Sequence, residues 1–137
     1  MVEESEKIEP TLLFSILCDD VRREDNGKFI LIGLFETIGA ANFPVRHAKL
    51  FVMNCWCSGM GEFTQRTRII APDGSKLIED EKTSFKLNDL RVKHRIVARF
   101  NNTLFRAPGE YSVEVLLNGE LKVRYPLIVE KIKPKIR

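Results

Sequence analysis

Residues 108–129 read PGEYSVEVLLNGELKVRYPLIV, and this stretch decides the fold. Apolar residues alternate with polar ones on both sides of Asn118-Gly119, a period of two that is typical of half-buried strands. A type I′ turn needs a positive φ angle at both central residues, which Asn and Gly tolerate. The stretch therefore predicts a β-hairpin that the chain enters through a corner at Pro108-Gly109.

The rest of the chain repeats the same period of two in further short segments and shows no long 3.6-residue periodicity. Turn residues such as Pro72-Asp73-Gly74 separate these segments. We therefore predict an all-β fold: an antiparallel two-sheet sandwich of the Ig-like or Greek-key type, with about eight strands and little helix, and a barrel as the alternative. The predicted segments outside the hairpin are 11–21, 28–38, 47–58, 63–71, 76–87 and 91–100, and the longest connection is 39–46.

Tyr111 lies two residues after Gly109, at the entry to a late strand. This placement is similar to the tyrosine corner of Greek-key sandwiches, in which the hydroxyl bonds to backbone a few residues upstream. The alternative is an ordinary core aromatic.

Length and charge predict one domain with two charged tails. A chain of 137 residues fits one domain, and a net charge of +3 is too small to indicate a class of partner. Residues 1–10 hold four Glu and one Lys, whereas residues 131–137 hold three Lys and one Arg. We expect an acidic tail over 1–10, a single sandwich domain over 11–130, and a basic tail over 131–137.

The N-terminus has no apolar signal segment, and the longest apolar run, residues 29–35, is too short to span a membrane. Three cysteines are an odd number and argue against a disulfide framework. We therefore expect a cytoplasmic protein without membrane contact. Cys55 and Cys57 share one strand face, but their spacing is not that of a metal site, so no metal and no cofactor are predicted.

The order of several short motifs resembles a family of small bacterial β-sandwich proteins of unknown function, from about residue 12 to residue 129. The resemblance implies the sandwich fold and a bacterial cytoplasmic setting, and it implies no catalytic residue. The motifs are Asp20 after an apolar strand, Asn26-Gly27-Lys28, Ile32-Gly33-Leu34-Phe35, Phe43-Pro44 with His47 close behind, Pro72-Asp73-Gly74, Pro108-Gly109-Glu110-Tyr111 and Asn118-Gly119-Glu120.

The early strands are apolar on both faces, although a sandwich needs only one apolar face from each sheet. A second subunit is the common cover for such a face, so we predict a homodimer, with another protein partner as a possibility. The alternative is that the chain covers this face itself, with the 39–46 connection and the N-terminal segment. The predicted interface residues are Phe14, Ile16, Ile30, Ile32, Phe51 and Met53.

A basic strand face supports a second hypothesis, weak binding of nucleic acid or another anion. Its residues are Arg91, Lys93, Arg95 and Arg99, and Lys122 with Arg124 would extend the patch if both strands share one sheet. No aromatic residue is interleaved for base stacking, and Glu114 would neutralise part of the charge. We therefore do not predict nucleic acid as the partner.

Catalysis is the weakest hypothesis. His47 is the one candidate acid–base residue, for a hydrolase or ligand-binding site, and a packing role is its alternative. His94 lies among inward-facing apolar residues and is predicted to be a core histidine. Asp19 and Asp20 are adjacent in a strand and point to opposite faces. We predict a non-catalytic module that acts through protein–protein interaction or self-association.

Overall fold

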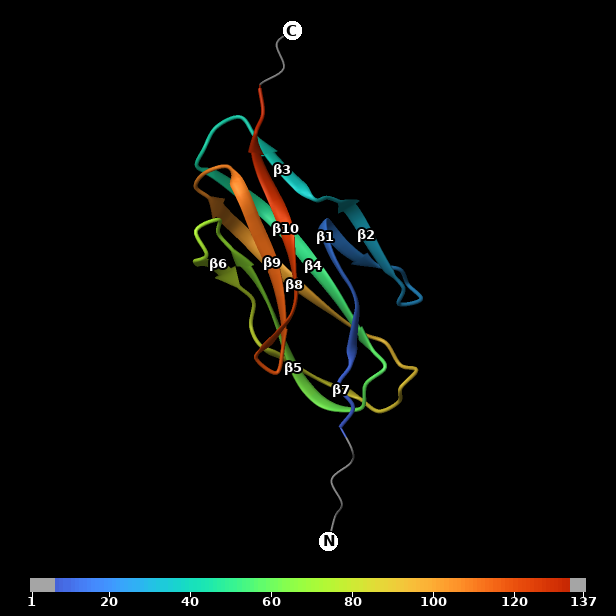
Figure 1. The fold of residues 1–137 in the computed structure, drawn as a ribbon. Helices are drawn as coiled ribbons and strands as arrows, with labels where there is room; N and C mark the ends of the chain where they lie inside the picture. The colour runs from blue at the N-terminus through green and yellow to red at the C-terminus, as the bar shows by residue number, and fades with distance from the viewer. Residues whose placement is uncertain (1–6, 134–137) are drawn as a thin grey trace.

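The computed structural model describes residues 7–133, and this part of the chain forms two β-sheets and no helix (Figure 1). The predicted all-β sandwich is confirmed. None of the described residues belongs to a helix that could cross a membrane. The strands are β1 (Thr11–Arg23), β2 (Phe29–Leu34), β3 (Thr37–Ala40), β4 (Val45–Cys57), β5 (Gly61–Ile70), β6 (Lys76–Glu79), β7 (Thr83–Leu87), β8 (His94–Phe105), β9 (Gly109–Leu117) and β10 (Glu120–Lys131).

The first sheet has the order β2-β1-β4-β8, and the second has the order β3-β10-β9-β5-β6 with β7 also paired to β5. The chain crosses from the first sheet to the second between β2 and β3. As a result β3 runs parallel to β10, and this pair departs from the predicted antiparallel arrangement. The predicted hairpin is confirmed as β9 and β10, which pair in antiparallel register on both sides of Asn118-Gly119.

Two predicted strands are each divided in the structure. The 28–38 segment becomes β2 and β3 because the chain changes sheets after Leu34. The 76–87 segment becomes β6 and β7, which pair with different halves of β5. Neither break, at LFE (residues 34–36) or at EDEK (residues 79–82), carries the glycine or proline of a turn, so each segment read as one strand.

The long strands β4 and β8 extend further than predicted. The predicted connection 39–46 ends in β4, which starts at Val45, and Asn101-Asn102 does not end β8. Val45 and Phe105 lie opposite each other, so the ladder between these strands continues past the two asparagines. Long-range pairing therefore overrides the local turn preference of Asn.

Tyr111 forms the predicted tyrosine corner. Its hydroxyl donates a hydrogen bond of 2.8 Å to the Ala107 carbonyl, four residues upstream. Its ring is buried and meets the Phe105 ring edge-on at a centroid distance of 5.1 Å. The corner thus ties the entry of β9 to the end of β8 inside the core.

A buried polar cluster joins the two sheets. Asn54 Nδ2 on β4 donates hydrogen bonds to Gln65 Oε1 (2.9 Å) and to Thr67 Oγ1 (2.8 Å) on β5. Trp56 Nε1 also donates to Gln65 Oε1, at 3.3 Å. All four side chains are at most 1% exposed. Buried polar groups need such partners, so the cluster fixes how β4 packs over β5.

Candidate functional site

A row of exposed apolar side chains lies on β2. Ile30, Ile32 and Leu34 are 39%, 42% and 64% exposed, and we call these three residues the β2 row. Phe29 and Leu31, which alternate with them, are half-buried. Single apolar residues on a surface are ordinary, but an adjacent set along one strand indicates a binding surface.

The β2 row follows a free sheet edge. Within residues 7–133, β2 pairs with β1 on one side and with no strand on the other. Glu24 N donates to Lys28 O at 2.8 Å, so this opposite pair is hydrogen-bonded. Bonded and non-bonded pairs alternate in an antiparallel ladder. The backbone groups of Ile30 and Ile32 therefore face β1, whereas those of Phe29 and Leu31 point outward and can pair with another strand.

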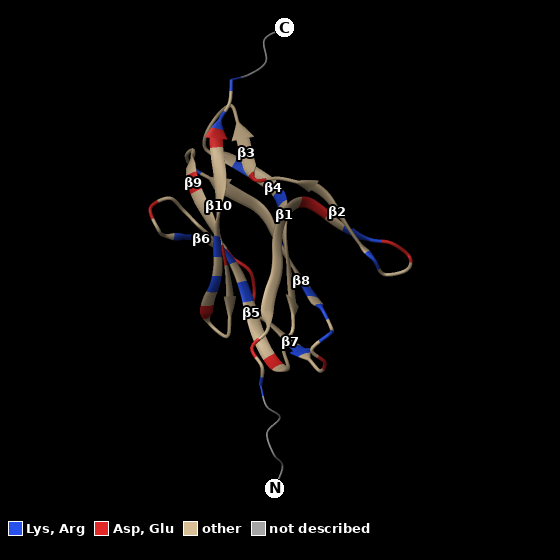
Figure 2. Ribbon diagram, turned by 45° about the vertical axis from the view of Figure 1, so that its right-hand side comes forward, with Lys and Arg blue, Asp and Glu red and all other residues tan. Residues whose placement is uncertain are grey.

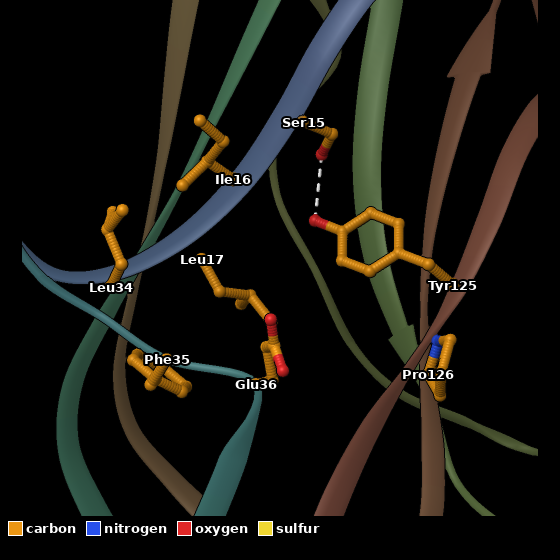
Figure 3. Close-up of a pocket in the computed structure, with 8 residues that line it drawn as sticks. All are labelled: Ser15, Ile16, Leu17, Leu34, Phe35, Glu36, Tyr125 and Pro126. Atoms are coloured by element: carbon orange, nitrogen blue, oxygen red, sulfur yellow. Dashed lines mark hydrogen bonds between the residues drawn. The ribbon is translucent and has the colours of Figure 1, made fainter.

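A cleft of about 500 Å³ opens beside the β2 row, between β1 and β10. We call it the β1–β10 cleft (Figure 3). The Ser15 and Tyr125 hydroxyls form a hydrogen bond of 2.8 Å across it. Leu34 belongs to both the cleft and the β2 row, so the two features form one continuous surface. The lining residues are Ser15, Ile16, Leu17, Leu34, Phe35, Glu36, Tyr125 and Pro126.

Tyr125 gives the cleft a measurable pH dependence. Burial raises the pKa of Tyr125 from 10.0 to about 12, although its bond with Ser15 acts in the opposite direction. The folded state thus favours the neutral phenol. This stabilisation is complete below the unfolded pKa of 10.0 and is lost as the pH rises to about 12.

Two pKa units correspond to about 3 kcal/mol of unfolding free energy. The wild type should lose this stability between about pH 10 and about pH 12, and we expect Tyr125→Phe to lose much less over the same range, measured by urea denaturation. A variant that loses stability as steeply as the wild type would contradict the prediction.

The six predicted interface residues lie in different environments. Ile30 and Ile32 are exposed in the β2 row, and Phe14 and Ile16 are half-buried on β1. Phe51 and Met53 on β4 are buried within the single chain, at 8% and 1% exposure. Because Ile16 lies opposite Met53 and Cys18 lies opposite Phe51, Ile16, Met53 and Phe51 project from one face of the first sheet, its outward face.

Part of this outward face is covered by the chain's own β1–β2 hairpin. Phe29 lies opposite Arg23 near the hairpin tip, yet its ring centroid is only 6.0 Å from Arg95 Cζ on β8. Arg95 is level with Cys55 and Phe14. Arg23 is nine residues further along the chain than Phe14, a distance of about 30 Å in a flat sheet. The hairpin must therefore bend back over the sheet, and Figure 1 shows it turning away from the first half of β1.

The four predicted anion-facing residues do not form one basic strand face. Arg91 and Lys93 precede β8, which begins at His94, and Arg91 forms an ion pair of 3.2 Å with Asp89. Arg95 and Arg99 are on β8 and point outward. The extension to Lys122 and Arg124 fails because β8 and β10 lie in different sheets.

Arg99 instead lies over an aromatic ring of the apolar face. Its Cζ lies 5.7 Å from the ring centroid of Phe51, and Lys49 Nζ lies 5.6 Å from the same ring. A cation over an aromatic face is attracted by the ring quadrupole. Lys49 and Arg99 therefore border apolar surface.

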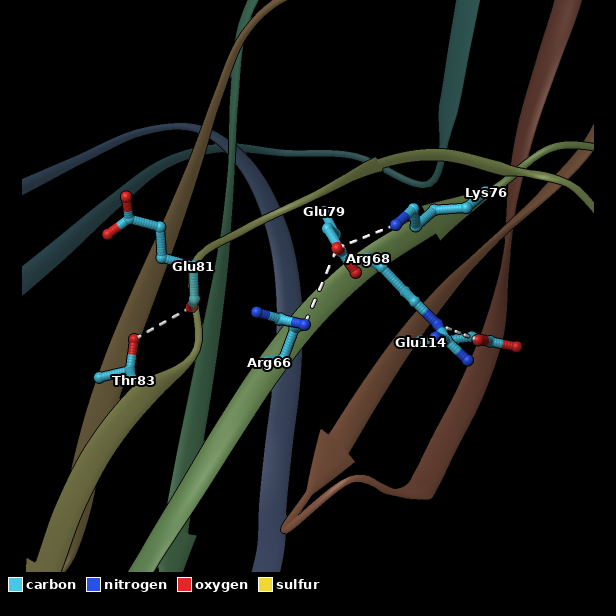
Figure 4. A network of polar contacts seen from close by, with 7 residues as sticks. All are labelled: Arg66, Arg68, Lys76, Glu79, Glu81, Thr83 and Glu114. Atoms are coloured by element: carbon cyan, nitrogen blue, oxygen red, sulfur yellow. Dashed lines mark hydrogen bonds and ion pairs between the residues drawn. The ribbon is translucent and has the colours of Figure 1, made fainter.

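The outward face of the second sheet carries a charge network that sequence reasoning found only in part. Glu114, 5% exposed, accepts a bond of 2.7 Å from Arg68 Nε and lies 3.3 Å from Arg124 Nε. Glu79 pairs with Lys76 at 2.9 Å and with Arg66 at 3.8 Å (Figure 4). Positive and negative bands alternate over β5 and β10 in Figure 2. Two carboxylates thus face four cations, so Glu114 neutralises part of the positive charge, as predicted.

His47 lies in an aromatic environment. Its ring centroid is 6.1 Å from that of Phe35 and 6.5 Å from that of Phe105. This environment agrees with a packing role, which we gave as the alternative to catalysis. His94 is half-buried at the rim of the core and stacks on Phe85 at 5.2 Å.

All three cysteines are free thiols. Burial raises the pKa of the Cys18 thiol and of the Cys55 thiol, which disfavours the reactive thiolate. Among residues 7–133, no group of three or more His, Cys, Asp or Glu side chains is placed to hold a metal ion.

Comparison with known proteins identifies a family and no activity. The model of a family of unknown function, DUF6941, matches residues 13–130, which confirms the resemblance seen in the sequence. No curated protein matches. A solved structure of the alkylpurine DNA glycosylase AlkC from Pseudomonas fluorescens, bound to DNA containing an abasic site analog, is similar with 14% identity and a TM-score of 0.46. The match covers 69% of this chain and 28% of that protein, and it gives no information about function.

Proposed function

The chain belongs to the DUF6941 family of unknown function, and from its geometry we propose that it is a non-catalytic module that binds protein partners by strand addition at the free edge of β2. The β2 row along an unpaired edge is the observation that carries this proposal. In strand addition, backbone hydrogen bonds provide affinity and alternate side chains provide specificity. β2 offers both, because the outward backbone groups of Phe29 and Leu31 alternate with the exposed side chains of Ile30 and Ile32.

The composition of β2 supports a role as a binding edge. Residues 29–34 read FILIGL, with no charge and no proline. Proteins usually protect a free edge with charges, proline or bulges, because an apolar edge pairs with other chains. The same molecule does so on β10, whose residues 120–127 have no second neighbour among the described strands. That edge carries Lys122, Arg124 and Pro126 and a bulge after Leu121.

Burial of the β2 row would contribute to affinity. Complete burial of a large aliphatic side chain is worth about 1.5–3 kcal/mol, so each half-exposed member of the row would add about 1 kcal/mol. The β1–β10 cleft continues from Leu34 and provides space for a partner side chain. The free thiols fit the reducing cytoplasm, which we retain as the proposed location.

The test is affinity capture from the native cell with three baits: wild type, Ile32→Glu and Leu121→Glu. Leu121 is 48% exposed on β10, so Leu121→Glu is a matched control that places the same charge on an exposed leucine outside the β2 row. We expect a protein that the wild type and the control retain and that Ile32→Glu loses. Hydrogen exchange should then slow at the Phe29 and Leu31 amides in the complex. Capture that is identical for all three folded baits would refute the proposal.

A further inference from the structure

We propose that the β1–β10 cleft receives a lysine or arginine side chain of the protein segment that adds to β2, with Glu36 as its counter-charge. This inference rests on the proposed function and names the chemistry of the partner. The cleft, at about 500 Å³, is large enough for such a side chain. It meets the β2 row at Leu34, so one partner segment can contact both features.

The β1–β10 cleft opens where β2 ends. Beyond Leu34 the chain turns to the second sheet, where Glu36 O accepts a hydrogen bond of 3.2 Å from Ile128 N. β1 residues 11–17 therefore pair with β4 on one side and with no strand of the described chain on the other. A segment that follows β2 past Leu34, in either direction, meets the cleft in place of a further strand.

The walls of the cleft suit the apolar stem of a long side chain. Ser15 and Leu17 project from one face of β1 and Ile16 from the other, yet all three line the cleft, so it follows the edge of this strand. Tyr125 and Pro126 form the opposite wall. Lysine and arginine pack their methylene groups on apolar surface of this kind and keep their charged ends near water.

Glu36 selects a cation as the end group. Among the described residues that line the cleft, it is the one that carries a charge. It is exposed and forms no ion pair with another residue of the range 7–133. Figure 3 shows its side chain directed into the cleft, toward Leu17. An apolar partner side chain would remove water from this carboxylate without replacing it, and an acidic one would be repelled.

The two hydroxyls of the cleft are compatible with the same end group. Ser15 and Tyr125 bond to each other at 2.8 Å, and each oxygen keeps a lone pair that can accept from an ammonium or guanidinium group. The cleft thus combines apolar walls, hydroxyl acceptors and an exposed carboxylate. These features together match a lysine or arginine side chain.

The test is selection of random peptides displayed on phage against the full chain. The baits are wild type, Glu36→Gln, Glu36→Lys and the control Glu62→Lys, which reverses an exposed charge on β5 outside the cleft. We expect wild type and control to select peptides with a Lys or Arg at a fixed spacing from alternating apolar residues. Glu36→Lys should select Asp or Glu at that position, and Glu36→Gln should show no charge preference there. All these positions are exposed, so the variants should fold.

The affinity of one selected peptide then locates the charge pair. Glu36→Gln, or norleucine in place of the peptide's Lys or Arg, should each raise the dissociation constant about fivefold, the upper range for an exposed ion pair. Both changes together should raise it no further, because they remove the same contact. Ile32→Glu should abolish binding, and Leu121→Glu should leave it unchanged. Isothermal titration calorimetry measures these constants.

The inference and the proposed function fail in different ways. Peptides that need Ile32 but show no preference for Lys or Arg, or keep that preference on Glu36→Lys, would refute the counter-charge and leave strand addition standing. Losses from norleucine and Glu36→Gln that multiply would place the cation elsewhere. Peptides that bind Ile32→Glu as tightly as wild type, or the lack of any peptide selected by the wild type, would overturn strand addition and the inference with it.

Discussion

Replacement of Tyr111 by alanine is expected to lower the free energy of unfolding by about 3–5 kcal/mol, the range for removal of a buried aromatic. Tyr111 is 3% exposed, packs edge-on against Phe105 and anchors β9 to Ala107. The substitution leaves a cavity between the sheets and a carbonyl without its donor. Urea denaturation measures this loss of unfolding free energy. The slope of the free energy against urea concentration should be compared between the variants.

Tyr111→Phe separates packing from the hydrogen bond. It keeps the ring and removes only the hydroxyl, so about 1–3 kcal/mol should be lost, the cost of a buried group left without its partner. If Tyr111→Ala unfolds at the wild-type urea concentration, the corner is not part of the stabilising core. If Tyr111→Phe loses as much as Tyr111→Ala, packing against Phe105 contributes nothing.

Replacement of Gln65 by leucine is expected to cost about 4 kcal/mol although the volume hardly changes. Gln65 Oε1 accepts from both Asn54 Nδ2 and Trp56 Nε1. Leucine would leave these two buried donors without that acceptor, at about 1–3 kcal/mol each. Thr67 keeps its bond to Asn54. Chemical denaturation measures the loss of unfolding free energy. A second substitution tests whether this loss comes from the broken hydrogen bonds.

That second substitution is Asn54→Leu. Removal of both partners of a buried hydrogen bond costs less than removal of one, so the double variant should be more stable than the sum of the two single losses implies. Strict additivity would mean that the two side chains do not interact in the folded protein. A loss for Gln65→Leu below about 1 kcal/mol would mean that the cluster does not hold β4 over β5.

The sequence by itself determined the fold class and much of the core. Alternation in a strand assigns each residue to a face, so the inward row on β4, Leu50, Val52, Asn54 and Trp56, was readable. Turn chemistry fixed the hairpin at Asn118-Gly119, and Gly109 before Tyr111 indicated the corner. These features are local, because they depend on backbone angles and on a period of two.

Only the tertiary structure decided which apolar residues are available for binding. The sequence grouped Phe51 and Met53 with Ile30 and Ile32, since all four have the same alternation. The β1–β2 hairpin bends back over the outward face, and in the folded chain the first two are buried while the last two remain exposed. Strand order likewise separated Arg95 and Arg99 from Lys122 and Arg124. Burial and strand neighbours depend on contacts between residues far apart in the chain. Alternation along one strand is a local pattern, so it cannot predict these contacts.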